Sequence, residues 1–214
     1  MRRRPRGGWS RAAFLGLAVA LAGAPWASEA RTETCWQVAP DSLEITWQAR
    51  WGETVITGGF RKADVTIFFD ADHPETARIR ARIPMAGLYA SDPEAVALLQ
   101  DPGWFDPARF PEAVFTARGL IPVGQDGPRR HYRAEGQLQL KGHRGPLALD
   151  IWLTPTGHNG WHAEAHAVID RRDYQIGAGA IADATAPDVP LRIRLNAVPA
   201  ACSESANSDP ADQR

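Results

Sequence analysis

The stretch from Tyr132 to Leu153, YRAEGQLQLKGHRGPLALDIWL, shows the expected fold of this chain most directly. Apolar or small residues alternate with polar ones from Tyr132 to Lys141, and a second alternating run begins at Leu147. A period of two is typical of β-strands that bury one face. Gly142 to Pro146 interrupts the pattern and predicts a hairpin connection. We expect the two strands to contribute one face to an apolar interior.

The same alternation recurs on both sides of this hairpin. It covers residues 43–51, 65–69, 76–83, 113–117, 161–169 and 191–197. About eight strands, each with a single apolar face, form either a closed barrel or a two-sheet sandwich. Cysteines near both ends of the pattern, Cys35 and Cys202, favour closure, because first and last strands become neighbours only when the sheet curls round. We therefore expect an all-β, eight-stranded antiparallel barrel.

One connection between these strands is unusual. Residues 101–115, DPGWFDPARFPEAVF, contain four aromatic residues and three prolines. The prolines exclude a helix or a central strand, whereas the aromatic side chains favour burial. Just before this segment, Pro93 to Gln100 predicts a helix of about two turns, with Pro93 at its first position. We expect this short helix and the aromatic connection to lie at the barrel mouth.

The chain is expected to have three parts. Residues 1–30 combine five arginines, an apolar run from Ala12 to Ala24 and small residues before Arg31, which is typical of a cleaved signal peptide. The alternative is a retained membrane anchor, although the apolar run is short for a span. Residues 31–200 would form the barrel and residues 201–214 a disordered polar tail. This organisation predicts a soluble periplasmic protein without a stable membrane span.

Charge and cysteine content limit the classes of function. Without residues 1–30 the chain has 19 basic and 24 acidic residues, a net charge of −5. This balance argues against a nucleic-acid partner, which requires a basic surface. Cys35 and Cys202 would form a disulfide in an oxidising compartment, with two unpaired thiols as the alternative. The two cysteines lack the spacing of a metal or redox motif.

A catalytic set is not evident, so we assign no catalytic residues, no cofactor and no metal. His162, Glu164 and His166 would lie on the outer face of a strand, where weak zinc binding is the alternative to solvated polar positions. Arg78, Arg80 and Arg82 similarly suit a solvated face, with anion binding as the alternative. The aspartates Asp101, Asp106, Asp170 and Asp173 each suit a turn. An enzyme that acts on a lipid or quinone through residues 170–173 is a rival hypothesis.

The inner face has an unusual composition. Large residues such as Trp47, Ile79 and Trp161 are mixed with many alanines and with Gly136. Small residues that face a barrel interior leave volume for an apolar ligand. The alternative is a solid core, in which the tryptophans fill the space that their small neighbours leave.

Several motifs resemble those of the YceI-like family of exported, lipocalin-like proteins that bind polyisoprenoids. Similar segments occur in the same order from about Trp36 to Ala197. They are Trp36 to Ser42, Gly58-Gly59-Phe60 with Phe68-Phe69-Asp70, Trp104-Phe105-Asp106 with Phe110-Pro111 and Phe115, Gly136 to Gly142 with Pro146-Leu147, and Ile169 to Ile176. Two departures are the nearly apolar helix before the aromatic segment and Tyr174-Gln175 in place of Phe-Gly. They concern the tunnel mouth and head-group preference rather than the fold.

The resemblance implies a lipocalin-like barrel around a tunnel that holds a polyisoprenoid or other long apolar lipid, as a non-enzymatic carrier. The protein could also form a homodimer, and the sequence leaves this point open. The expected lining combines the inward-facing residues with aromatic residues at the mouth. It consists of Ile45, Trp47, Ala49, Ile67, Phe69, Ile79, Ile83, Leu98, Leu99, Trp104, Phe105, Phe110, Phe115, Ala134, Gly136, Leu138, Leu140, Leu149, Ile151, Trp161, Ala165, Leu191 and Ile193.

Overall fold

The computed structural model of the chain describes residues 34–157 and 159–201. The expected signal peptide, most of the polar tail and Cys202 lie outside these residues. Cys35 is buried at the start of the first strand, opposite Ala200. The disulfide between Cys35 and Cys202 stays a prediction.

The described residues form twelve strands, two α-helices and three short 3-10 helices. In chain order the strands are β1 (Cys35–Val38), β2 (Glu44–Trp51), β3 (Thr54–Phe60), β4 (Asp64–Phe68), β5 (Arg78–Pro84), β6 (Leu88–Ala90), β7 (Glu112–Arg118), β8 (Ile121–Asp126), β9 (Arg129–Leu140), β10 (His143–Thr156), β11 (Gly160–Asp170) and β12 (Asp188–Ala200). The helices are η1 (Pro74–Thr76), η2 (Met85–Gly87), α1 (Pro93–Leu99), η3 (Arg171–Tyr174) and α2 (Gly179–Asp183).

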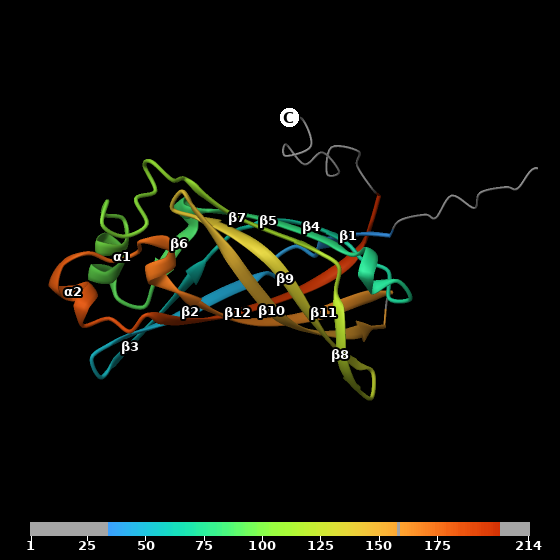
Figure 1. The fold of residues 1–214 in the computed structure, drawn as a ribbon. Helices are drawn as coiled ribbons and strands as arrows, with labels where there is room; N and C mark the ends of the chain where they lie inside the picture. The colour runs from blue at the N-terminus through green and yellow to red at the C-terminus, as the bar shows by residue number, and fades with distance from the viewer. Residues whose placement is uncertain (1–33, 158, 202–214) are drawn as a thin grey trace, which may run out of the picture. The chain divides into compact units, whose positions relative to one another are not determined.

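Eight strands close into an antiparallel barrel. The order around the ring is β1-β4-β5-β7-β9-β10-β11-β12, and β1 pairs with both β4 and β12 to complete it. Closure leaves no unpaired edge in the ring, which confirms the predicted eight-stranded barrel. Figure 1 shows the long strands β9 to β12 crossing the molecule beneath β4, β5 and β7.

The remaining strands extend this ring. β12 is long enough to pair with β1 along Ala197–Ala200 and with β2 along Leu191–Arg194. β3 then pairs with β2, and β6 with β3. β1 and β2 are therefore consecutive neighbours of one strand, joined by the turn over residues 39–43.

The two α-helices lie at the same end of the barrel (Figure 1). α1 begins at Pro93, and the Asp92 carboxylate accepts a hydrogen bond of 2.8 Å from the backbone N–H of Glu94. This N-cap satisfies a donor that the first turn leaves unpaired. The predicted short helix is thus confirmed. No helix in the described part of the chain has the length and hydropathy required to cross a bilayer.

The aromatic connection after α1 contacts the segment that carries α2. The backbone N–H of Gly177 donates to the carbonyl of Gly103 at 2.9 Å. A Cβ at Gly103 would come within 2.9 Å of the Ala178 Cβ, so the two segments approach closely. Together they form one end of the barrel.

Three local details differ from what the sequence predicts. Residues 121–126 form the strand β8, paired with β9, which none of the predicted strands covers. The connection between β9 and β10 is only Lys141-Gly142, both with positive φ, and β10 starts at His143 instead of after Pro146. Such a two-residue turn matches the twist of the paired strands. Trp51 ends β2 as a 46% exposed side chain, because it lies beyond residues 44–47, where β2 pairs with the barrel strand β12.

Candidate functional site: an apolar cavity inside the barrel

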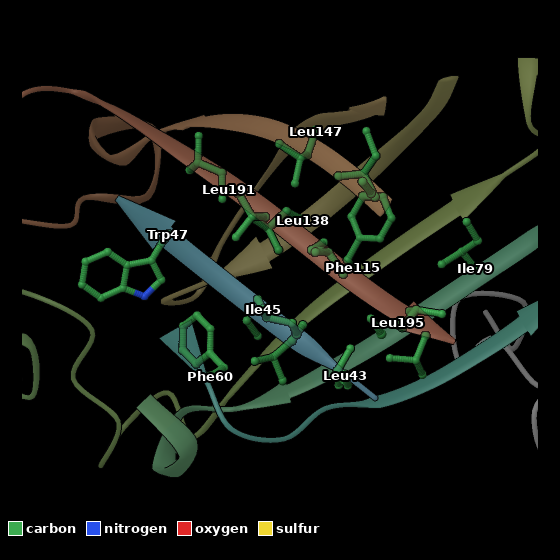
Figure 2. A pocket seen from close by; sticks show the side chains of 18 of the residues that line it. Leu43, Ile45, Trp47, Phe60, Ile79, Phe115, Leu138, Leu147, Leu191 and Leu195 are labelled. Carbon is green, nitrogen blue, oxygen red and sulfur yellow. The ribbon is translucent and has the colours of Figure 1, made fainter. Parts of the chain in front are cut away.

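The barrel encloses a cavity of about 230 Å³. Its lining is apolar except for Arg171 and Thr185. Figure 2 shows side chains from several strands converging on this space, with Trp47 and Phe60 towards one end and Ile79 and Leu195 towards the other. A cavity with this lining suits a hydrophobic guest.

Strand alternation explains how the lining is built. On β12 the odd-numbered residues from Val189 to Ala197 all face the cavity, while Arg192 and Asn196 are exposed on the outside. At about 3.3 Å per residue, this row extends the lining over about 25 Å along the strand. The cavity is therefore elongated, as a chain-like ligand requires.

An aromatic cluster combines side chains from β1, β9 and β11 with Phe69, which directly follows β4. The ring centroid of Phe69 lies 5.8 Å from that of Trp161 and 5.7 Å from that of Tyr132, both at steep angles. Trp36 packs edge-on against Trp161 at 6.4 Å, and its Nε1 donates to the carbonyl of Phe69 at 2.8 Å. Edge-to-face packing of this kind stabilises aromatic pairs. In this part of the lining, the aromatic side chains therefore hold one another in defined orientations.

Trp104 and Phe105, from the connection over residues 101–115, also line the cavity. Trp104 is buried, and Phe105 packs edge-on against Phe60 with ring centroids 6.3 Å apart. The backbone N–H of Phe105 donates to the carbonyl of Leu99, which ties the connection to α1. The segment thus covers the cavity beside the short helix.

The structure places most of the predicted lining residues around this cavity. Four lie elsewhere. Gly136 is covered by the ring of Phe115, and Ala134 is fully buried within the wall. Phe110 packs on Gly142, and Leu98 on the partly buried margin of the core. Whether the remaining residues contact a ligand stays a prediction.

The cavity has further lining residues that the prediction omitted. Most continue an inward-facing row of a predicted strand, and the alternation contains their signal. They are Leu43, Val65, Ala77, Ala81, Ala113, Leu147, Leu153, Ala163, Ile169, Val189, Leu195 and Ala197. Others come from β1, β3 or connections, where no alternation identifies them. These are Trp36, Phe60, Met85, Leu120, Arg171, Ile176 and Thr185.

Arg171 is a buried cation that is held by backbone carbonyls. Its guanidinium donates to the carbonyls of Ile176 at 2.8 Å, Ala182 at 2.5 Å, Thr185 at 2.7 Å and Ala186 at 3.1 Å. These acceptors span the segment that contains α2. Arg171 therefore fixes this segment against the end of β11.

The neighbouring charged residues also have structural roles. The Asp170 carboxylate accepts hydrogen bonds from the backbone and side chain of Arg172, and these bonds lower the pKa of Asp170 to about 2. A carboxylate with a pKa of about 2 has a low affinity for protons, which makes it a poor general base near neutral pH. Burial raises the pKa of Tyr174, and Asp173 is exposed. The geometry of residues 170–174 thus supports an ordered turn rather than an acid–base pair.

His162, Glu164 and His166 lie on the outer face, as expected. Glu164 accepts hydrogen bonds from Arg192 and His166, and Arg129 lies 3.3 Å away. The bond from Arg192 is the main reason why the pKa of Glu164 falls to about 2. His162 contacts the Asn196 amide oxygen instead. Within residues 34–157 and 159–201, no three histidine, cysteine or acidic side chains are grouped as a metal site.

The fold and cavity define a closed antiparallel barrel with an apolar interior. The family model described as the YceI-like domain matches residues 36–197. The chain belongs to the YceI-like family, which confirms the resemblance found in the sequence.

Curated relatives are distant. A UPF0312 protein of Pseudomonas savastanoi pv. phaseolicola is 26% identical over 110 residues, which are 51% of this chain and 55% of the relative. Protein YceI of Escherichia coli is 25% identical over 130 residues, 58% of this chain and 65% of the relative. The chain therefore spans somewhat more than half the length of these curated relatives.

Solved structures show the same fold. Burkholderia cenocepacia BcnA has a TM-score of 0.67 at 20% identity, with 73% of this chain and 96% of that chain covered. A polyisoprenoid binding domain from Saccharophagus degradans has a TM-score of 0.58 at 13% identity, with 77% and 98% covered. At these identities the likeness establishes the architecture.

Proposed function

We propose that this chain is a non-enzymatic binding protein that holds a polyisoprenoid or another long apolar lipid inside its barrel. The observation that carries the proposal is the elongated cavity, whose lining is apolar except for Arg171 and Thr185. An isoprenoid chain matches such a lining because it is long, narrow and almost without polar atoms.

Binding would come mainly from removing the lipid from water. Burial of apolar surface contributes about 25 cal/mol per Å², less the cost of ordering the chain. The aromatic cluster around Phe69 and Trp161 lowers part of this cost, because its side chains pack against one another and hold each other in place. Affinity then depends on chain length more than on a single contact.

Membership of the YceI-like family supports this proposal, as does the shared fold with a protein described as a polyisoprenoid binding domain. The turn structure of residues 170–174 supports a binding role over the rival enzymatic one. We further propose that the protein acts in the periplasm as a lipid carrier or buffer. The signal-like pattern of residues 1–30 supports this location, and cell fractionation with and without these residues tests it.

Mass spectrometry of organic extracts tests the function directly. The full chain is purified without detergent, its surface is washed, and the denatured protein is then extracted. We expect one class of long apolar lipid at a nearly constant ratio to protein. An extract without lipid, combined with no uptake of added isoprenoid, would favour a solid structural barrel and reject the proposal.

A further inference from the structure

Three large apolar side chains are exposed at the end of the barrel that carries the two α-helices. They are Trp51 at the end of β2, Val55 near the start of β3 and Ile181 in α2, with exposed fractions between 42% and 46%. We call these three residues the apolar tip. Figure 1 shows the β2–β3 hairpin at the helical end, whereas β8, with the exposed Ile121 and Val123, lies away from it. Scattered apolar side chains are normal on a surface, but a group at one end indicates an interaction site.

Hydrogen bonds join the hairpin to the α2 segment. The backbone N–H of Gly52 donates to the carbonyl of Ala184 at 3.1 Å, and Trp51 and Thr185 form an isolated bridge. The Thr185 hydroxyl in turn donates to the Ile181 carbonyl at 2.7 Å. The hairpin and α2 are therefore parts of one surface.

The apolar tip adjoins the cavity. Ile45, Trp47 and Ala49 line the cavity, and Trp51 is the next residue of this inward-facing row on β2. Thr185, the bridge partner of Trp51, also belongs to the lining. Apolar surface thus continues from the barrel interior to the outside at this end.

The two faces of the hairpin distinguish a lipid bilayer from a protein partner. Val55 pairs with Arg50 and Thr54 pairs with Trp51, so the Trp51 and Val55 side chains point to opposite faces. A protein would cover one face, whereas lipid surrounds both faces of a tip that enters it. Stable protein interfaces also bury about 800 Å² on each side, far more than three side chains provide. Tryptophan, by contrast, favours the interfacial region of a bilayer, because its ring is apolar and its N–H is polar.

Charged residues beside the apolar tip limit how deeply it can enter a bilayer. Arg50, Glu53 and Asp183 are exposed there, and charged side chains are unfavourable in the hydrocarbon region. Two acidic side chains and one basic side chain provide no net attraction to anionic lipids. The nearly apolar helix α1, whose charged side chain is Glu94, lies at the same end. This combination suits the headgroup region of a zwitterionic bilayer.

We propose that the apolar tip docks on the surface of a lipid bilayer and orients the adjoining end of the cavity towards the membrane. This inference rests on the proposed function and adds the partner with which the barrel exchanges its lipid. Docking shortens the path on which an apolar ligand meets water, and contact of apolar surface with water is unfavourable.

Fluorescence quenching tests the contact of Trp51 with lipid. The purified full chain is titrated with phosphatidylcholine vesicles that carry brominated acyl chains, which quench tryptophan on contact. We expect the wild type to show a quenched component that Trp51→Phe lacks. This difference reports on Trp51 even when another segment also binds the vesicles. Equal quenching of the two proteins would overturn the proposal.

Vesicle flotation measures how much the tip contributes to binding. Trp51→Ser should weaken partitioning into phosphatidylcholine vesicles about tenfold or more, because the exposed indole surface is no longer removed from water. Ile121→Ser, the matched control with a similarly exposed side chain on β8, should bind like the wild type. An equal loss in the control, or binding that requires anionic lipid and disappears in salt, would contradict docking through the apolar tip. A dimer that Trp51→Ser dissociates would instead assign the tip to a second copy of the chain.

Lipid transfer separates this inference from the proposed function. The rate at which a pyrene-labelled isoprenoid hydrocarbon moves between vesicles should fall in Trp51→Ser. Equilibrium binding of the same probe should match the wild type, because Trp51 lies outside the cavity lining. If the hydrocarbon binds but vesicles leave Trp51 unquenched, this inference fails and the proposed function stands. If the hydrocarbon does not bind, the proposed function fails, and the quenching result alone decides whether the tip docks on lipid.

Discussion

The ring of Phe115 lies directly over Gly136. A Cβ added at Gly136 would come within 2.5 Å of both Cε2 and Cζ of that ring. The two residues lie on paired strands, with Phe115 opposite Leu138 on β9. The space that glycine leaves is therefore occupied by an aromatic side chain of the neighbouring strand.

Replacement of Gly136 by alanine should consequently destabilise the barrel. The added methyl group displaces the Phe115 ring or the Thr116 carbonyl, which lies 2.6 Å from the same position. Overpacking of this kind typically lowers the free energy of unfolding by about 1–3 kcal/mol. Urea denaturation measures the change. Gly124→Ala in β8 is the control, because no atom lies within 4 Å of its added Cβ, and a comparable loss there would refute the packing explanation.

Leu138→Arg should abolish lipid binding. Leu138 is buried and lines the cavity, so an arginine at this position introduces an unpaired charge among apolar side chains. Co-purified lipid is quantified by mass spectrometry and folding by circular dichroism. The adjacent Gln137→Arg, on the exposed face of the same strand, provides the control and should retain its lipid. Equal lipid content in the two folded variants would contradict a binding site inside the barrel.

Arg171→Met should loosen the segment that contains α2. The substitution leaves four backbone carbonyls without the donor that joins them, and we expect the free energy of unfolding to fall by about 2–4 kcal/mol. Hydrogen exchange over residues 177–186 should accelerate more than exchange in β9 or β10. The exposed Arg144→Met should change stability by less than about 0.5 kcal/mol. Unchanged exchange in the α2 segment would show that Arg171 does not hold it.

Glu164 should make a contribution to stability that disappears in acid. The hydrogen bond from Arg192 lowers the pKa of Glu164 from 4.5 to about 2 in the folded protein. The contribution is therefore fully present above about pH 4.5 and is lost as the pH falls towards 2. Melting temperatures of wild type and Glu164→Gln should differ at pH 6 and converge near pH 2. The exposed Glu53→Gln serves as control, and a difference between wild type and Glu164→Gln that does not vary with pH would oppose this assignment.

The sequence predicted those parts of the fold that depend on a single strand. Alternation identifies the inward row of β12 because each residue faces either the cavity or solvent, independently of other segments. The strand β8 was not predicted, because all six of its residues are exposed and its apolar residues Ile121 and Val123 therefore mark no buried face.

Features that depend on neighbouring segments were less predictable. The small size of Gly136 suggested free volume, yet Phe115 fills that space from another strand. The Arg171 contacts join residues up to fifteen positions apart in an irregular segment. The indole nitrogen of Trp47 is likewise unpaired because no neighbouring segment places an acceptor within hydrogen-bond distance. Such properties become visible only when the packed side chains are placed together.

The pairing of β12 with β11, β1 and β2 has a consequence for the order of folding. A hairpin such as β9–β10 assembles from local contacts, but the seam between Cys35 and Ala200 joins segments about 165 positions apart. Such non-local pairing is slow because a long loop must close first. During synthesis, the wall therefore remains open until β12 has emerged, and the barrel interior is accessible from the side before this last strand is in place.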